Sequence, residues 1–487
     1  MILPKTRRPA MIAALLALAG CSFAPHYRVP STSLPAGFRD APDWRAAAPS
    51  DAVAKGEWWL LFDDPVLTAL EQRVRVNNQN VAASAAAYAQ ARAAVREARA
   101  SLFPTVSLTG GGTMAGTFGS GTATIIAGNT TGGGTTTHSN SSGSRRYTVA
   151  AGASWEPDLW GRLTNTVTQQ KALAQASEAD LNNATLSAQG ELALNYVQLR
   201  GLEAQKAILD ATVAAYARAL TITSNRYTQG VAAKVDVLQA QTQLITAKAN
   251  AADLVRQRAI FEHAIAVLVG ENPATFVLPE QPWNRTVPTV PATLPAALLE
   301  RRPDIAGAER RVASANAAIG IARAAFFPSL TLSGSLGGQS GTLASLFTAG
   351  ASIWSLGAQG ALTLLDFGAR AAQVAQSRAA YEQAVATYRQ TVLTAFQQVE
   401  DELAATGVLA YVGDQRAAAA QAANRVEQLT QNQYLAGTIA YTDVITAQAT
   451  ALSARQSEAQ AIVDRQVAAI TLIQAIGGSW PADAPPR

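Results

Sequence analysis

Histidine and carboxylate side chains carry most acid–base and metal chemistry in proteins, and in this sequence they are scattered. The three histidines are His26, His138 and His263. The patterns that organise a nucleophile, a phosphate loop or a zinc site are missing: there is no G-x-S-x-G, P-loop, H-E-x-x-H or G-x-G-x-x-G. Carboxylates such as Asp158 and Glu191 are explained more simply as helix caps or solvated charges than as an acid–base pair. We therefore expect a protein that is not an enzyme and that needs neither a cofactor nor a metal.

The reactive side chain with the most informative surroundings is Cys21, the single cysteine of the chain. One cysteine excludes a disulfide framework and a cysteine-based zinc cluster. Residues 1–20 indicate a signal peptide, because basic residues precede an apolar run that is too short to span a bilayer as a helix. Leu18-Ala19-Gly20-Cys21 looks like the lipobox of bacterial lipoproteins, in which the cysteine becomes the lipidated first residue. Ser22 resembles the outer-membrane sorting pattern of such signals. A plain secretory signal with an incidental cysteine is the alternative.

Charge and composition argue against a nucleic-acid-binding protein and in favour of long helices. The formal net charge of +4 falls when Lys5, Arg7 and Arg8 leave with the signal peptide, so the mature chain lacks the basic footprint of a nucleic-acid-binding protein. The chain is rich in alanine, with 15% charged and 6% aromatic residues. This composition suits long, closely packed helices better than a thick globular core.

The chain repeats one switch from helix to strand. A helical pattern stops at Phe326-Phe327-Pro328, because proline disfavours the helical region for the residue before it, and alternation of polar and apolar residues follows at once. The same switch occurs 224 residues earlier, at Leu102-Phe103-Pro104. Two Tyr-x-x-Gly turns, which end in Gly230 and Gly437, lie 207 residues apart. The chain is therefore a duplicated unit whose first half is longer by a single insertion.

Each half is predicted to surround a pair of strands with helices. The expected helices run from Val66 to about Ser101, Arg162 to Thr228, Val231 to Leu268 and Ala296 to Phe326, with matching long helices after Gly368. The expected strands form two hairpins, from Thr105 with Tyr147–Trp155, and Ser329–Gly337 with Ile353–Leu365. Gly110 to Ser144, rich in Gly, Ser and Thr, is predicted to be a mobile loop. We divide the chain into a signal peptide (1–20), a lipidated tether with an equatorial segment (21–64), a first repeat (65–270), an equatorial linker (271–295), a second repeat (296–477) and a tail (478–487).

Four strands of about ten residues with one apolar face suit β structure in a bilayer. Four strands cannot close a barrel, and an open edge in lipid leaves backbone groups unsatisfied, so closure has to come from other copies. Two copies give a lumen filled by side chains, whereas three give twelve strands and a water-filled bore. A soluble antiparallel sheet is the alternative for either hairpin alone. Aromatic residues at the strand ends fit an interfacial girdle: Phe103, Tyr147, Trp155, Phe327 and Trp354.

These motifs resemble the TolC-type outer-membrane efflux factors, most closely the lipoprotein branch of NodT-like and OprM-like channels. The resemblance covers nearly the whole mature chain. It is carried by Arg302-Pro303-Asp304-Ile305 through Phe326-Phe327-Pro328, by Trp155-Glu156-Pro157-Asp158-Leu159-Trp160-Gly161-Arg162 and Leu365-Asp366-Phe367-Gly368, and by the two Tyr-x-x-Gly turns. It implies an α+β membrane protein that is a homotrimer. Its twelve-stranded transmembrane β-barrel, with four strands per chain, would continue into a long periplasmic α-helical barrel.

The resemblance also implies a function. Such a protein is a passive exit duct in the cell outer membrane for small toxic compounds or drugs, which an inner-membrane resistance-nodulation-division (RND) pump and a periplasmic adaptor protein hand over. A duct for type I protein secretion has the same fold and is the alternative. A periplasmic enzyme or a structural lipoprotein is a third reading that the motifs favour less. The sequence favours efflux through the lipobox and the NodT-like motifs, and it does not define the cargo.

A periplasmic gate is implied at the two helical turns. Asp236 and Asp443 each follow a turn glycine by six residues. In the family, an aspartate at the position of Asp443 contributes to an acidic ring, and a tyrosine at the position of Tyr434 contacts an aspartate at the position of Asp236 on a neighbouring hairpin. A basic partner of some members is Ile439 here, and Lys234 is a candidate replacement. Alternatively, both aspartates merely cap the return helices near their positive dipole ends. The predicted gate residues are Tyr227, Gly230, Asp236, Tyr434, Gly437 and Asp443.

Overall fold

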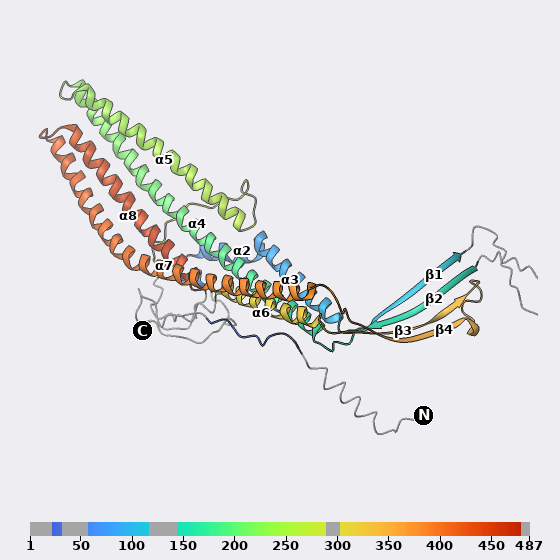
Figure 1. The fold of residues 1–487 in the computed structure, drawn as a ribbon. Helices are drawn as coiled ribbons and strands as arrows, with labels where there is room; N and C mark the ends of the chain where they lie inside the picture. Colours follow the sequence, from blue (N-terminus) through green and yellow to red (C-terminus); the bar gives the residue numbers. More distant parts are fainter. Residues whose placement is uncertain (1–21, 32–56, 116–143, 289–301, 479–487) are drawn as a thin grey trace, which may run out of the picture. The chain divides into compact units, whose positions relative to one another are not determined.

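The computed structural model describes residues 22–31, 57–115, 144–288 and 302–478. This part of the chain consists mostly of helices, with one four-stranded sheet (Figure 1). The elements in chain order are η2 (Trp58–Phe62), α2 (Pro65–Asn77), α3 (Gln79–Ala100), β1 (Thr105–Ala115), β2 (Ser144–Trp155), α4 (Arg162–Thr228), α5 (Lys234–Leu268), α6 (Pro303–Ala324), β3 (Ser329–Ser340), η4 (Ala349–Ala351), β4 (Ser352–Ala361), α7 (Ala369–Leu435) and α8 (Tyr441–Ala475). The chain folds as two compact units. The first comprises residues 1–28, 92–172 and 313–382, and the second comprises the rest.

The four strands of the first unit form a single antiparallel sheet in the order β1-β2-β3-β4. The predicted pairs β1–β2 and β3–β4 are confirmed. β2 and β3 also pair, with Tyr147 opposite Ser340 and Trp155 opposite Leu332, so the two predicted hairpins become one sheet. β1 and β4 are the outer strands, and among the described residues each pairs with one strand only.

Several predicted strand boundaries were wrong. β2 begins at Ser144 rather than Tyr147, and β3 ends at Ser340 rather than Gly337. Gly110, Gly111 and Gly112 belong to β1 rather than to a mobile loop, because they pair in register with β2. Backbone N–H and C=O groups form the ladder whatever the side chain is, so a run of glycines does not end a strand that has a partner. β4 ends at Ala361 rather than Leu365, because its partner β3 begins opposite Ala361. The rest of the predicted loop, residues 116–143, lies outside the described residues.

Aspartates make the turn from strand to helix in the first unit. Asp158 accepts hydrogen bonds from the backbone N–H of Leu163 (3.1 Å) and Thr164 (2.7 Å) at the start of α4. This geometry confirms Asp158 as a helix cap. Asp366 does the same for α7, where it accepts from the N–H of Gly368 at 3.1 Å and of Arg370 at 3.2 Å. The shared caps fit the duplication of the chain.

The residues that follow Cys21 are fixed on the first unit. The Ser22 hydroxyl donates to Asn165 Oδ1 at 3.0 Å. The ring of Phe23 stacks on Phe327 with centroids 4.3 Å apart, and Trp160 stacks on Phe327 at 4.9 Å. Phe23 is therefore held beside the residue at which α6 gives way to β3. Cys21 itself and residues 32–56 of the predicted tether lie outside the described residues.

The helices come in pairs of equal length. α4 and α7 have 67 residues each, α5 and α8 have 35, and α3 and α6 have 22. The predicted bounds of α4 are confirmed. The return helix α5 begins at Lys234 rather than Val231, because the backbone N–H groups of Val231 and Ala232 both donate to Arg226 in the turn. Within the described residues, no helix has both the length and the apolar character needed to cross a membrane.

The predicted continuous helix from Val66 to Ser101 was wrong, because it breaks at Asn78. Asn78 has an extended backbone, with φ −66° and ψ 123°, and its Oδ1 accepts from the N–H of Asn80 and Val81, which starts α3. Its Nδ2 donates to the carbonyl oxygen of Leu268 at 2.8 Å. Since Leu268 is the last residue of α5, one asparagine both caps α3 and joins it to the end of α5.

Arg302 occupies the matching position in the second half, 224 residues after Asn78. Its guanidinium donates to the carbonyl oxygen of Ala475, the last residue of α8, at 2.7 Å. It also donates to Gln398 and pairs with Asp304, both at 2.8 Å. The start of α6, just after Arg302, is thus joined to the end of α8. The predicted helix from Ala296 begins at Pro303 in the described residues, and residues 296–301 lie outside them.

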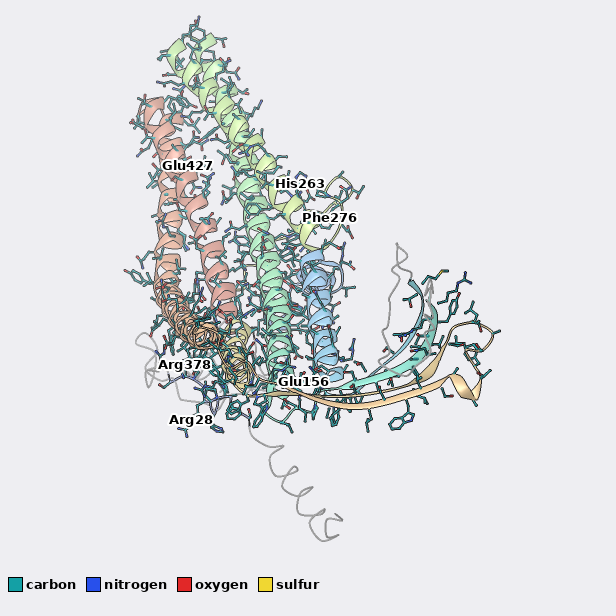
Figure 2. The ribbon with its side chains drawn as sticks, turned by 45° about the vertical axis from the view of Figure 1, so that its right-hand side comes forward. Arg28, Glu156, His263, Phe276, Arg378 and Glu427 are labelled. Carbon is teal, nitrogen blue, oxygen red and sulfur yellow. The ribbon has the colours of Figure 1, made fainter. Side chains whose placement is uncertain are left out.

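The equatorial linker lies against the second unit as far as residue 288. Arg258 of α5 donates to the carbonyl oxygen of Leu278 at 2.5 Å, and Arg200 of α4 donates to that of Pro279 at 3.0 Å. Both arginines also pair with Glu203, at 2.8 and 2.7 Å. Arg200 is 1% exposed and Glu203 7%, so charged hydrogen bonds rather than apolar contacts alone bind this linker. Figure 2 labels Phe276, which precedes this stretch and packs into the core of the unit.

Candidate functional site

Two identical turns connect the long helices of the second unit. Gly230 has φ +72° and Gly437 has φ +76°, a left-handed conformation that glycine adopts without strain. The N–H of Gly230 donates to Tyr227 and that of Val231 to Arg226, at 2.9 and 2.8 Å. The second turn repeats this pattern, with Gly437 donating to Tyr434. Both α4 and α7 therefore end in a Schellman motif, which explains the spacing of the paired Tyr-x-x-Gly signals.

The two turn tyrosines have different surroundings. Tyr227 is 43% exposed, whereas Tyr434 is 7% exposed. The Tyr434 ring lies under the guanidinium of Arg226, 4.7 Å from the ring centroid, and Arg226 Nη1 donates to the backbone oxygen of Tyr434 at 3.1 Å. The ring also packs on Tyr441 with centroids 5.2 Å apart. Tyr434 is thus the centre of a contact between the two hairpin tips of one chain.

Tyr441 is the first residue of α8 and is 4% exposed. Its burial raises the pKa of its hydroxyl to about 12, and Tyr434, Tyr216 and Asp236 act in the same direction. A hydrogen bond with Thr223 of α4 opposes these effects on the pKa. The phenol is therefore neutral at physiological pH.

The structure places Asp236 and Asp443 at equivalent positions, the third residue of α5 and of α8. Asp443 is exposed and Asp236 is half-buried. The N-cap residues are Ala233 and Ala440, which make no side-chain cap hydrogen bond. Neither aspartate is therefore the N-cap residue, although both stand in the first turn, where the helix dipole favours a negative charge.

Within one chain, the structure shows which partners these residues have. Tyr434 Oη is buried and has no hydrogen-bond partner within the described residues, so no hydrogen bond joins it to Asp236 in one copy. Ile439 packs against the apolar cluster around Tyr434, and Lys234 is exposed. The cation that does reach Tyr434 is Arg226. Sequence reasoning missed Arg226 and Tyr441, and the only available signal was that the duplication replaces them with Gln433 and Lys234.

Some of the aromatic residues at the strand ends are exposed, and others contact neighbouring residues. Phe103 is 68% exposed and Trp354 78%. Trp155 donates its indole N–H to the carbonyl oxygen of Leu102 at 3.0 Å, and Phe327 belongs to the stack with Phe23 and Trp160. Tyr147 is half-buried and lies at the other end of β2 from Trp155. A belt of aromatics at both strand ends is the pattern of membrane interfaces.

A pair of charges spans the α7–α8 hairpin. Glu427 on α7, labelled in Figure 2, pairs with Arg455 on α8, and Arg455 also donates to Asn424 Oδ1 at 2.6 Å. A metal site would need a cluster of ligating side chains. Within the described part of the chain, no three His, Cys, Asp or Glu side chains lie close enough together to hold a metal ion.

Comparison with known proteins gives a consistent result. The model of the "Outer membrane efflux protein" family matches residues 70–271 and 294–478. The chain is 30% identical to the probable efflux pump outer membrane protein TtgC of Pseudomonas putida, over 95% of this chain and 93% of the relative. It is also 30% identical to the pyoverdine export outer membrane protein OpmQ of Pseudomonas aeruginosa, over 97% of both chains. The solved outer-membrane channel OprN superposes with a TM-score of 0.83 at 27% identity, over 94% of this chain and 100% of that one.

Proposed function

The chain belongs to the outer membrane efflux protein family, and from that premise we propose that it is the passive outer-membrane exit duct of a tripartite efflux system. In this proposal a periplasmic adaptor and an inner-membrane RND pump deliver small toxic compounds to it. The duct supplies a path and no chemistry. The names of the relatives point to small molecules: they describe the export of toluene, antibiotics and pyoverdine by those proteins.

The observation that carries the proposal is the sheet with two open edges. β1 and β4 each pair on one side only among the described residues. Apolar side chains along the sheet are exposed, among them Val106 (77%), Leu108 (76%) and Leu356 (82%). In a bilayer both edges have to be paired, and pairing β4 of one copy with β1 of the next achieves this. Three copies would give twelve strands around a water-filled bore. The aromatics Phe103, Tyr147, Trp155, Phe327 and Trp354 would then lie at the membrane interfaces.

Loss of the gene tests the function. We expect its deletion to raise the cellular accumulation of a fluorescent small-molecule pump substrate several-fold, because the pump then has no outer-membrane exit. The wild-type gene on a plasmid should restore low accumulation. A type I secretion duct is the alternative, and it predicts the reverse: unchanged accumulation together with the retention of a secreted polypeptide in the cell.

The Cys21 anchor is a proposal that rests on the lipobox and on its neighbours. Since Ser22 and Phe23 are fixed beside Phe327, a lipid on the preceding residue would start next to the end of the sheet. We expect Cys21→Ser to abolish labelling of the protein with palmitate, because serine cannot form the thioether. Ser22→Ala, which removes the hydroxyl that donates to Asn165 and accepts from the N–H of Ala24 but keeps the thiol of Cys21, should still be labelled. Palmitate labelling of Cys21→Ser would exclude the anchor.

The helical tips are proposed as the periplasmic gate. Three copies would bring together six turns, at Gly230 and Gly437, and six first-turn carboxylates, at Asp236 and Asp443. Tyr227 and Tyr434 would flank them. The support is the position of both aspartates at the start of a return helix directly after the turn. Carboxylates converging on an axis would attract cations to the entrance.

A further inference from the structure

The four-stranded sheet has one apolar face and one polar face. Side chains alternate along a strand, and residues directly opposite each other on neighbouring strands share a face, so the pairing register assigns every residue to one of the two. One face carries large exposed apolar side chains: Val106, Leu108, Met114, Leu336, Trp354 and Leu356. The other carries mostly small, hydroxyl and amide side chains, with Ile353 as the apolar exception, and it includes Ser107, Thr109, Thr148, Ser335, Ser355 and Gln359. In the proposed barrel the apolar face meets lipid, so the polar face lines the bore.

Charged residues are nearly missing from this part of the sequence. Residues 105–155 and 329–361 comprise the four strands and the connections within each hairpin, and they include no Asp, Glu or Lys. Their two arginines are Arg145 and Arg146, which are neighbours in β2 and have exposed side chains. Arginine keeps its charge at any physiological pH. The fixed charge of these segments is therefore positive and lies at one point of β2.

The register places the two arginines on opposite faces of the sheet. Arg145 pairs with Met114 and belongs to the apolar face, whereas Arg146 pairs with Thr113 and belongs to the polar face. Both lie at the end of the sheet that is remote from the helices. All four connections to α3, α4, α6 and α7 are made at the other end (Figure 1). Since the helices form the periplasmic extension, Arg146 lies at the outer mouth of the bore.

We propose that Arg146 forms a ring of three guanidinium groups at the outer mouth of the duct, where the ring attracts small anions and repels cations. The proposal rests on the proposed function, because it needs three copies around one bore. Rings of arginine favour anions in pores, and here the strands and their connections supply no carboxylate to neutralise the ring. The mouth thus has the opposite charge to the helical tips, where Asp236 and Asp443 lie. A cation that has left the duct meets a barrier to its return.

The test measures the electrical potential beside Arg146 and does not depend on the state of the periplasmic end. A cysteine replaces Thr148, two residues along β2 on the same face, and intact cells are treated with an anionic or a cationic reagent, sulfonatoethyl or trimethylammonioethyl methanethiosulfonate. Both reagents react with the same thiolate, so the ratio of their rates reports the local potential rather than the reactivity of the thiol. We expect Arg146→Gln to lower the anionic-to-cationic ratio at Thr148→Cys several-fold. Arg145→Gln is the matched control: it removes the same charge from the opposite face of the strand and should change the ratio far less.

A cysteine at Val149, on the apolar face, separates this proposal from the proposed function. Thr148→Cys should react with both reagents, and Val149→Cys, which would face lipid, should react with neither. Any other pattern of labelling means that the two faces do not meet bore and lipid, and the proposed barrel then fails. If the pattern is as expected but Arg146→Gln leaves the ratio unchanged, or Arg145→Gln lowers it equally, the arginine ring is refuted and the function stands.

Discussion

Replacing Arg302 with alanine is expected to lower the free energy of unfolding by about 3 kcal/mol. The side chain is 10% exposed and holds three partners: the carbonyl oxygen of Ala475, Gln398 and Asp304. Alanine would leave the last carbonyl of α8 without this donor and the carboxylate of Asp304 without its cation. The carbonyl oxygen of the buried Ala475 would be left without this donor, which costs more than the hydrogen bond itself gains, whereas Asp304, which is 28% exposed, stays partly solvated. Chemical denaturation of the purified protein in detergent would measure the change.

The duplication supplies the matched control for this experiment. Asn78→Ala removes a neutral cap and its hydrogen bond to Leu268, so we expect a smaller loss of about 2 kcal/mol. Arg302→Lys keeps the charge but not the fork of donors, and it should fall between the wild type and Arg302→Ala. Equal stability of the wild type and Arg302→Ala would mean that the end-to-end junction of α6 and α8 is held by apolar packing alone.

The second large effect is expected at the proposed gate. Asp443→Asn keeps the size of the side chain and removes its charge, and we expect it to reduce the preference of the pore for cations over anions several-fold. The reason is that an exposed carboxylate near the axis acts within a Debye length, about 8 Å at physiological salt. Asp236→Asn should have a smaller effect, because Asp236 is half-buried. Reversal potentials across a salt gradient would measure the selectivity.

Two outcomes have different meanings in this experiment. If Asp443→Asn lowers the selectivity while Glu427→Gln, further down the α7–α8 hairpin, does not, the charge acts at the tip itself. If neither Asp443→Asn nor Asp236→Asn changes the reversal potential, both aspartates serve only the dipoles of α5 and α8. Such a result would remove the acidic ring from the proposed function and would leave the turns at Gly230 and Gly437 as its structural elements.

Much of the fold was predictable because its boundaries are local signals. α4 runs from Arg162 to Thr228 as expected, because glycines flank it and no proline interrupts it. The break at Asn78 was missed because asparagine also occurs inside helices, and its role depends on Leu268, 190 residues away. The glycines of β1 were assigned to a loop because composition does not reveal a paired partner strand. Boundaries set by distant partners cannot be read from a local pattern.

The candidate site divides in the same way. The turns at Gly230 and Gly437 need a left-handed backbone conformation that glycine adopts without strain. Because this requirement is local, the positions of the turns were predictable from the sequence. The partner of Tyr434 was not, because Arg226 lies 208 residues away from it. The sequence showed that the base at Ile439 was missing, but it offered Lys234 as a replacement on proximity alone. The contact of the Arg226 guanidinium with the Tyr434 ring depends on how the two hairpins pack together, and the spacing of residues along the sequence does not show this.

The equal lengths of the helix pairs restrict how such a chain can change over time. α4 and α7 have both kept 67 residues, and α5 and α8 have both kept 35, although the two halves now share few identical side chains. A one-residue insertion in one helix would rotate every later side chain by about 100° and shift it by about 1.5 Å, out of step with its neighbours. The difference in length between the halves falls instead between β1 and β2. Since the two halves diverged, their long helices have therefore changed by substitution and kept their lengths. The connection between β1 and β2 has instead changed in length.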